Sequence, residues 1–327
     1  MLLTPTLARR LLNDAVERRY AILAINADSP AAIYDCLEAA RECDSPVIIE
    51  ASLWQLKGHS FGAGDARLGL ARYLTEIALL GAQERFHQVP IIFHTDHIKG
   101  PETFDLLAAA ITGVDRLRAS TISLDSSAMS EEENLEMIGR LCRIAGEQQC
   151  DLTLEVEAGL DTEVVPVEVC DRIVGMAERN NPGYLALWAP GVGTQHGLSE
   201  GGYPSFDAEA VRRHQERASE LCQRPIGIAL HGSSGLPAES LQEAVANGAV
   251  KINWSSESLL IRSSAAQSYY QEKAPELNKS HGSWKITAMD NGLQSYIAER
   301  YQPAVRSRIS ILGSAGQGAR FLRALQP

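Results

Sequence analysis

The chain has 327 residues, 45% of them hydrophobic, and a formal net charge of −11. This length suits two average domains or one α/β barrel. The acidic balance, with no run of lysine or arginine, argues against nucleic acid or an anionic membrane as the main partner. Residues 1–10 lack the layout of a signal peptide, and no apolar stretch reaches membrane-spanning length. We therefore expect a soluble, cytoplasmic protein.

Apolar runs typical of strands alternate along the chain with helical patterns. The predicted strands are Ala21–Asn26, Pro46–Ser52, Pro90–His97, Thr121–Ser127, Asp151–Glu157, Tyr184–Ala189, Pro225–His231 and Ala249–Ser255. Several are continuously apolar, as expected of parallel strands covered by helices. Helical periodicity is clear at Ala31–Glu42, Leu68–Leu80, Ser130–Gln148 and Pro237–Asn247. This alternation predicts a (β/α)8 TIM barrel spanning residues 1–327 as one domain, with a doubly wound sheet as the alternative.

Two local patterns place helix ends. Ser130 followed by Glu133 predicts a capping box at the start of a helix, and Asn247-Gly248 predicts a helix stop. The six cysteines form no C-x-x-C pair, so we expect free thiols in a reducing compartment rather than disulfides or a thiolate zinc site. They are Cys36, Cys43, Cys142, Cys150, Cys170 and Cys222.

Histidines at the ends of three different strands are the strongest functional signal. His97 closes one strand with Asp96 beside it, His231 closes another, and His196 follows a third across a short loop. The carboxyl ends of barrel strands form the active-site face, so these side chains should meet there. Three neutral imidazoles around Zn²⁺ leave a coordination position open, as in catalytic zinc sites. Other polar residues at strand ends are Asp125, Glu157 and Asn253.

The segment His231-Gly232-Ser233-Ser234-Gly235 predicts a phosphate site beside this metal. Its bare backbone N–H groups can form an anion nest, and loops after the seventh and eighth barrel strands often hold phosphate. Asn253, Ser255 and Ser256 add donors from the next strand. A metal for a carbonyl beside a nest for a phosphate describes a ketose-phosphate site.

Short motifs in a fixed order carry a resemblance over nearly the whole chain. They are Tyr20–Asn26, Ser45–Ser52, Asp96-His97, Ser123-Leu124-Asp125, Glu155-Val156-Glu157, His196-Gly197, Leu230–Gly235, Val250–Asn253 and Gly313–Gly316. In this set the chain resembles the class II, zinc-dependent fructose-bisphosphate and tagatose-bisphosphate aldolases.

The resemblance implies a role for each matched residue. It implies that His97, His196 and His231 hold zinc and that Asp96 exchanges the proton of the hydroxyl that becomes the aldehyde oxygen. Asp125 and Glu157 match acidic positions that touch a second or displaced metal in some members. The expected substrate contacts are Gly197, Gly232, Ser234, Asn253, Ser255 and Ser256, with Asn26 and Ser52 at the rim. It further implies a phosphorylated ketose substrate, a homodimer or higher homo-oligomer, and a monovalent cation as an additional cofactor.

Several positions depart from the family pattern. Leu198-Ser199-Glu200 places an acid where a cation is common, and Ser233 and Ser255 replace a glycine and an aspartate. The loop after Glu157 is shortened to residues 158–163, leaving Glu163 as the candidate general acid. Residues 53–64, with Trp54, Lys57 and His59, are longer than usual. We therefore expect dihydroxyacetone phosphate, or a close analogue, as one product, a different aldehyde as the other, and fructose bisphosphate as a poor substrate.

Two other functions fit parts of the pattern. A metal-dependent hydrolase on the same barrel would use zinc to activate water, with Asp96 as base. A silent binding relative is disfavoured by retention of Asp96 and all three histidines. The other histidines outside the motifs, and two tryptophans, are expected to pack or to lie at the surface. They are His59, His87, His214, His281, Trp188 and Trp254.

Overall fold

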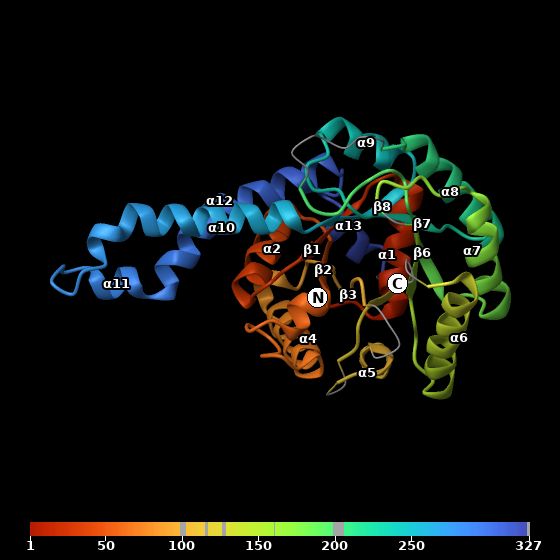
Figure 1. Ribbon diagram of the computed structural model, residues 1–327, viewed down its shortest axis with the longest axis horizontal. Coiled ribbons are helices and arrows are strands. Elements are labelled where there is room, and N and C mark those ends of the chain that lie inside the picture. Colours follow the sequence, from red (N-terminus) through yellow and green to blue (C-terminus); the bar gives the residue numbers. More distant parts are fainter. Residues whose placement is uncertain (99–102, 115–116, 126–128, 160, 199–205, 326–327) are drawn as a thin grey trace.

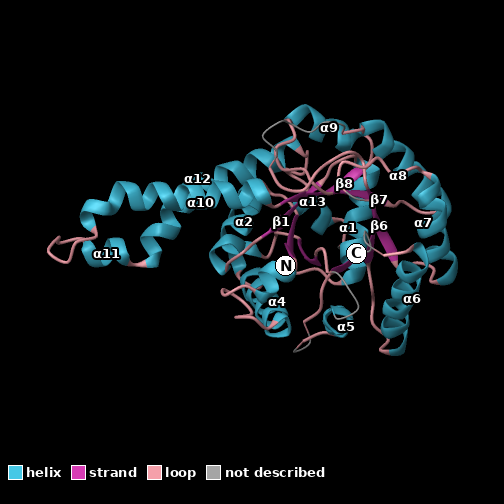
Figure 2. Cartoon of the chain, viewed as in Figure 1, coloured by secondary structure: helices cyan, strands magenta, loops and turns pink. Residues whose placement is uncertain are grey.

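The chain forms a barrel with surrounding helices and a helical arm projecting from one side (Figure 1). The computed structural model describes residues 1–98, 103–114, 117–125, 129–159, 161–198 and 206–325. Eight parallel strands close in chain order, with β8 paired to β1. Figure 2 shows strands inside a surrounding ring of helices. They are β1 (Ile22–Asn26), β2 (Val47–Ala51), β3 (Ile91–Thr95), β4 (Thr121–Leu124), β5 (Leu154–Ala158), β6 (Leu185–Pro190), β7 (Gly227–Leu230) and β8 (Ala249–Trp254). The predicted (β/α)8 barrel is confirmed, and the doubly wound sheet is wrong.

Several strands end before the polar residues that the sequence placed at their carboxyl ends. β3 ends at Thr95, so Asp96 and His97 start the following loop, and His231 likewise follows β7. The difference is physical: these side chains leave the hydrogen-bonded ladder to face the open end of the barrel. Ser126 and Ser127, predicted in the fourth strand, lie outside the described residues.

Helices lie around the barrel, and the first of them lies across its N-terminal end. They are α1 (Pro5–Arg18), α2 (Pro30–Glu42), α3 (Leu53–Lys57), α4 (Ala66–Gly81), α5 (Phe104–Thr112), α6 (Glu131–Glu147), α7 (Glu168–Asn180), α8 (Ala208–Cys222) and α9 (Ala238–Ala246). The four predicted helices correspond to α2, α4, α6 and α9. The capping box is confirmed: Ser130 Oγ accepts from the Glu133 N–H at 3.2 Å, and a Glu133 oxygen accepts from the Ser130 N–H at 2.9 Å.

The N-terminal end of the barrel is closed by an apolar plug. Leu11 and Leu12 of α1 join a buried cluster with Ile22, Ile92 and Val250 from the strands. Polar chemistry is therefore confined to the middle and the carboxyl end of the barrel, and the carboxyl end is where solvent can enter.

An arm formed by the chain after β8 was not predicted. It comprises α10 (Ser256–Lys273), η3 (Ala274–Glu276), α11 (Trp284–Ala288) and α12 (Asp290–Ile311), and α13 (Gly318–Arg323) follows it. α10 and α12 lie side by side and carry α11 at the far tip (Figure 1). Large apolar side chains of the arm are exposed: Leu260, Tyr270, Leu277, Trp284, Ile286 and Met289.

The packing predictions for cysteine and tryptophan hold. All six cysteines are free, and all but Cys43 are buried. Trp188 and Trp254 are buried, and the indole N–H of Trp188 donates to Nδ1 of His214 at 3.2 Å. His214 is thus a satisfied core residue. In the described part of the chain, none of the helices combines the length and apolar character needed to cross a membrane.

Candidate active site

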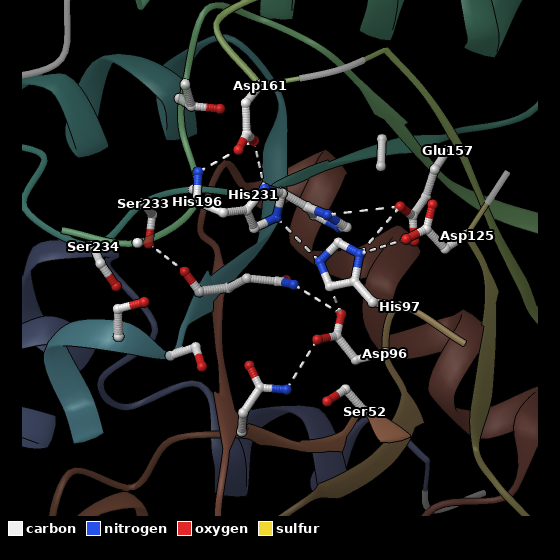
Figure 3. Close-up of a pocket in the computed structure, with 18 of the residues that line it drawn as sticks. Ser52, Asp96, His97, Asp125, Glu157, Asp161, His196, His231, Ser233 and Ser234 are labelled. Carbon is white, nitrogen blue, oxygen red and sulfur yellow. Dashed lines mark hydrogen bonds and ion pairs between the residues drawn. The ribbon is translucent and has the colours of Figure 1, made fainter. Parts of the chain in front are cut away.

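The three predicted histidines meet at the carboxyl end of the barrel (Figure 3). One ring nitrogen from each of His97, His196 and His231 lies within 4.8 Å of the others, and the Nε2 atoms of His97 and His196 are 3.1 Å apart. His97 reaches this position with a backbone φ of 48°, a left-handed conformation that is uncommon outside glycine. Such strain clusters at functional sites because surrounding structure must hold it in place.

A carboxylate contacts the outer nitrogen of each imidazole. Asp125 Oδ2 lies 3.2 Å from His97 Nδ1, and Asp161 Oδ1 lies 2.6 Å from His196 Nδ1. Glu155 Oε1 lies 3.0 Å from His231 Nε2. With the outer N–H groups donated to carboxylates, the inward nitrogens are Nε2 of His97, Nε2 of His196 and Nδ1 of His231. This carboxylate–histidine pairing is the usual environment of histidine metal ligands.

The donor set therefore fits a metal ion such as zinc. Three imidazole nitrogens converge, their orientation is fixed by carboxylates, and the cavity beside them leaves room for a further ligand. Burial disfavours the charged form of His97, but the carboxylates of Asp96 and Glu157 outweigh it and raise the pKa of His97 well above its usual value. Burial and the neighbouring His97 lower the pKa of His231. The carboxylates around His97 thus favour a positive charge on that side chain, and this charge disfavours protonation of the neighbouring His231.

Asp96 lies beside the histidines as a buried, ionised carboxylate. Its Oδ2 accepts from the Asn26 amide at 2.9 Å and its Oδ1 from the Asn253 amide at 3.0 Å. Burial alone would raise the pKa of Asp96, but the charges of His97 and Lys251 lower it to about 2. Asp96 Oδ1 is 3.9 Å from His97 Nε2, so the carboxylate can accept a proton from a group held at the cluster.

Asp125 and Glu157 form a second acidic group around His97. Their oxygens and a His97 nitrogen lie within 4.8 Å of one another. Glu157 also accepts from the Ser123 hydroxyl, and burial raises its pKa above the usual range. His97, Asp125 and Glu157 form a group whose ligand atoms could hold a metal ion.

A cavity of about 940 Å³ joins this cluster to every predicted substrate residue. Its lining includes Asn26, Ser52, Gly197, Gly232, Ser234, Asn253, Ser255 and Ser256. The backbone N–H groups of Gly232, Ser233 and Ser234 contact no acceptor among the described residues. Gly232 has φ 65°, and a Cβ there would lie 2.7 Å from the carbonyl of Gln195, so the turn requires glycine.

Some polar groups at the two ends of the cavity already form hydrogen bonds within the protein. The Ser233 hydroxyl donates to the Asn253 carbonyl, and the Gly235 N–H points to Glu257 Oε2 at 3.4 Å. The predicted nest is therefore shortened to residues 232–234. Ser52 caps α3: its Oγ accepts from the Trp54 N–H at 3.2 Å, and its O–H donates to Gln55 Oε1 at 2.7 Å. Ser199 and Glu200 lie outside the described residues.

The comparison with known families agrees with this geometry. The sequence profile described as fructose-bisphosphate aldolase class-II matches residues 6–317. The chain belongs to the class II fructose-bisphosphate aldolase family. Aldolases are carbon–carbon lyases, and members of this family generally depend on a metal, which the histidine cluster of this aldolase can hold.

Individual relatives of this aldolase are distant and differ in their named substrates. Fructose-bisphosphate aldolase 1 of Paracoccidioides lutzii is 27% identical over 277 residues, covering 75% of this chain and 74% of that protein. The 6-phospho-5-dehydro-2-deoxy-D-gluconate aldolase of Bacillus subtilis is 26% identical over 323 residues, covering 95% and 97%.

Solved structures share the fold at lower identity. The fructose-bisphosphate aldolase of Campylobacter jejuni superposes with a TM-score of 0.80 at 22% identity, over 96% of each chain. The YdjI aldolase of Escherichia coli K12 superposes with a TM-score of 0.69 at 22% identity, over 97% of this chain and 100% of that one.

Sequence reasoning gave no role to a network of ionisable side chains beneath the histidine cluster. Lys251 Nζ lies 3.1 Å from Glu155 Oε2 and 3.3 Å from Glu50 Oε2, and all three side chains are fully buried. His94 Nε2 lies 3.6 Å from the same Glu155 oxygen. The sequence contained a sign of this network, because Glu50 and Lys251 interrupt otherwise apolar strands.

The two carboxylates of the loop after Glu157 lie in different surroundings. Asp161 lines the cavity and bonds to His196, whereas the exposed Glu163 is not part of the described lining. The sequence offered both residues, and only the fold shows that Asp161 lies near the site.

Proposed function

We propose that this chain is a zinc-dependent aldolase that reversibly cleaves a phosphorylated ketose into an aldehyde and dihydroxyacetone phosphate or a close analogue. The observation that carries the proposal is the meeting of three carboxylate-oriented histidines with an ionised Asp96 in one cavity. Family membership supports the carbon–carbon cleavage, while zinc and the substrate are our own inferences.

The residues divide the chemistry between them. Zn²⁺ held by the three imidazoles would polarise the carbonyl of the ketose. Asp96 takes the proton from the hydroxyl on the carbon that becomes the aldehyde and returns it in the synthetic direction. Asn26 and Asn253 hold both carboxylate oxygens of Asp96, so its position is fixed before substrate arrives.

The loop after β7 is the proposed phosphate site. The N–H groups of Gly232, Ser233 and Ser234 are available to an anion, and the hydroxyl groups of Ser255 and Ser256 lie in the same cavity wall. Backbone N–H groups bind an anion without the help of a charged side chain. Phosphate can therefore bind here although Glu200 stands where a cation is common in the family. The loop would hold the dihydroxyacetone phosphate half.

Asp125 and Glu157 support a second or displaced metal position beside His97. The exposed apolar side chains of the arm, including Trp284 and Ile286, support a homodimer or higher homo-oligomer in which a second copy covers them. Light scattering of the purified chain tests the assembly, and a monomer at micromolar concentration would contradict it. We also propose a cytoplasmic location, in keeping with six free thiols.

The decisive experiment is a cleavage assay. The zinc-loaded protein is incubated with a panel of ketose monophosphates and bisphosphates, and triose phosphate and inorganic phosphate are measured separately. We expect triose phosphate from at least one ketose phosphate, with fructose bisphosphate a poor substrate. Release of inorganic phosphate without triose phosphate would identify a hydrolase and refute the proposal.

A further inference from the structure

A partly buried ion pair lies behind the loop after β7, where α10 and α12 meet the barrel (Figure 1). Glu257 is in the first turn of α10 and Arg308 in the last turn of α12. Arg308 Nη2 donates to Glu257 Oε2, and the two side chains are 9% and 32% exposed respectively. They line a separate cavity of about 220 Å³, and neither is among the residues that line the 940 Å³ cavity. The pair can therefore affect a bound substrate only through the residues in between.

The Glu257 carboxylate is held against the proposed phosphate loop. Its Oε2 accepts from the Gly235 N–H at 3.4 Å and from the indole N–H of Trp254 at 2.8 Å. The Glu257 N–H donates to Ser234 Oγ at 3.2 Å. Ser234 lines the 940 Å³ cavity, and its own N–H is one of those available to an anion. A carboxylate thus lies directly behind the segment that is proposed to bind a phosphate.

Arg308 offsets the charge of this carboxylate. A lone carboxylate here would weaken phosphate binding because like charges repel, whereas a guanidinium stays protonated at any physiological pH. The guanidinium carbon of Arg308 lies over the Trp254 ring, 5.5 Å from its centroid, and the Trp254 ring stacks on Tyr301. Arg308 Nη1 is buried and has no hydrogen-bond partner among the described residues. Arg308 therefore keeps a fixed positive charge beside Glu257.

We propose that the Arg308–Glu257 pair sets the net charge behind the phosphate loop and thereby the affinity of the enzyme for the phosphate of its substrate. The inference rests on the proposed aldolase function and adds two positioning residues that do not touch the substrate. The pair is neutral in the parent. Loss of Arg308 leaves a net charge of about −1 and neutralisation of Glu257 leaves about +1, since each side chain carries one unit charge. Phosphate affinity should follow this charge.

The test compares Arg308→Met, Glu257→Gln and the double variant. Calorimetric titration of each zinc-loaded protein with dihydroxyacetone phosphate gives its dissociation constant. We expect this constant to rise about tenfold in Arg308→Met, to fall about threefold in Glu257→Gln and to return near the parent value in the double variant. In the cleavage reaction the same changes should appear in KM, with kcat nearly unchanged, and they should shrink at high salt. A purely structural role predicts a double variant at least as weak as Arg308→Met.

Arg306→Met is the matched control, because Arg306 also lies on α12 and binds a glutamate of another helix, Glu42 Oε2 at 2.6 Å, away from the loop. It should bind dihydroxyacetone phosphate like the parent, and all variants should hold the same amount of zinc. If Arg308→Met fails to fold, Glu257→Gln decides, because its side chain keeps the shape and the acceptor oxygen. Binding by Glu257→Gln that is no tighter than in the parent would overturn the proposal. Failure of the parent both to bind dihydroxyacetone phosphate and to release triose phosphate would refute the aldolase function itself.

Discussion

The rim of the barrel and the layer beneath it carry the same kinds of charged residue in different environments. At the rim, the side chains of His97, His196 and His231 are 22%, 52% and 12% exposed. In the layer beneath, Glu155 and Lys251 are fully buried and contact one another. Rim groups can exchange ligands with solvent, whereas the buried groups can only orient and polarise what lies above them. We therefore propose that the rim residues carry out the chemistry and that the buried layer holds them in position.

Loss of a rim histidine should have the largest effect. We expect His97→Ala, His196→Ala and His231→Ala each to lose bound metal and turnover while the barrel stays folded, because two imidazoles hold Zn²⁺ poorly. Metal analysis, activity and circular dichroism check this, with the exposed His59→Ala as control. Full metal occupancy in all three variants would show that the histidines are not the ligands.

Asp96→Asn should separate proton transfer from metal binding. The amide preserves shape but cannot accept the proton, so we expect cleavage to fall roughly 10²-fold or more with metal content unchanged. The exposed Asp105→Asn should behave like the parent. Near-normal cleavage by metal-replete Asp96→Asn would eliminate the role of Asp96.

Glu155→Gln probes the buried layer. The neutral amide can still accept from His231 but holds its ring less strongly, so we expect metal affinity to fall about 10- to 100-fold. Chelator competition measures this, and the exposed Glu136→Gln serves as control. If the affinity of Glu155→Gln matches that of the control, the buried carboxylate does not orient the ligand.

The histidines at the rim could be predicted from the sequence, whereas the meeting of the buried charged residues beneath them could not. The reason is physical. His97 and His231 follow apolar runs, and the end of a strand can be located from the run alone. Glu50 and Lys251 lie inside strands, and their meeting depends on which strand face points inward and on the register of eight strands around the closed barrel. A single sequence does not contain that register.

Outside the barrel, the arm and the shortened loop were also beyond sequence reasoning. Residues 256–311 lack the strand–helix alternation that identified the barrel, so no element was assigned there. The choice between Asp161 and Glu163 depends on the path of a loop, which no periodicity determines. The confirmed capping box at Ser130, by contrast, is local chemistry and could be predicted residue by residue.

The smallest expected effect concerns the pH dependence of stability. Burial and Asp96 raise the pKa of Glu50 from its ordinary 4.5 to about 8 in the folded chain. A raised pKa means that the stability contributed by the protonated carboxyl is complete below pH 4.5 and is lost as the pH rises through about 8. In metal-free protein, the unfolding temperature of the parent should therefore fall more between about pH 6 and pH 9 than that of Glu50→Gln. If the unfolding temperatures of the parent, of Glu50→Gln and of the exposed Glu243→Gln control fall equally over this pH range, Glu50 does not titrate this way.

Zinc titration of the metal-free protein tests the central claim most directly. Cleavage of the best ketose phosphate is measured as Zn²⁺ is added in substoichiometric steps. We predict that activity rises in proportion to zinc and levels off at about one equivalent per chain, as three histidines forming one catalytic site require. Full activity in the metal-free protein, or zinc binding at one equivalent without any release of triose phosphate, would contradict the account.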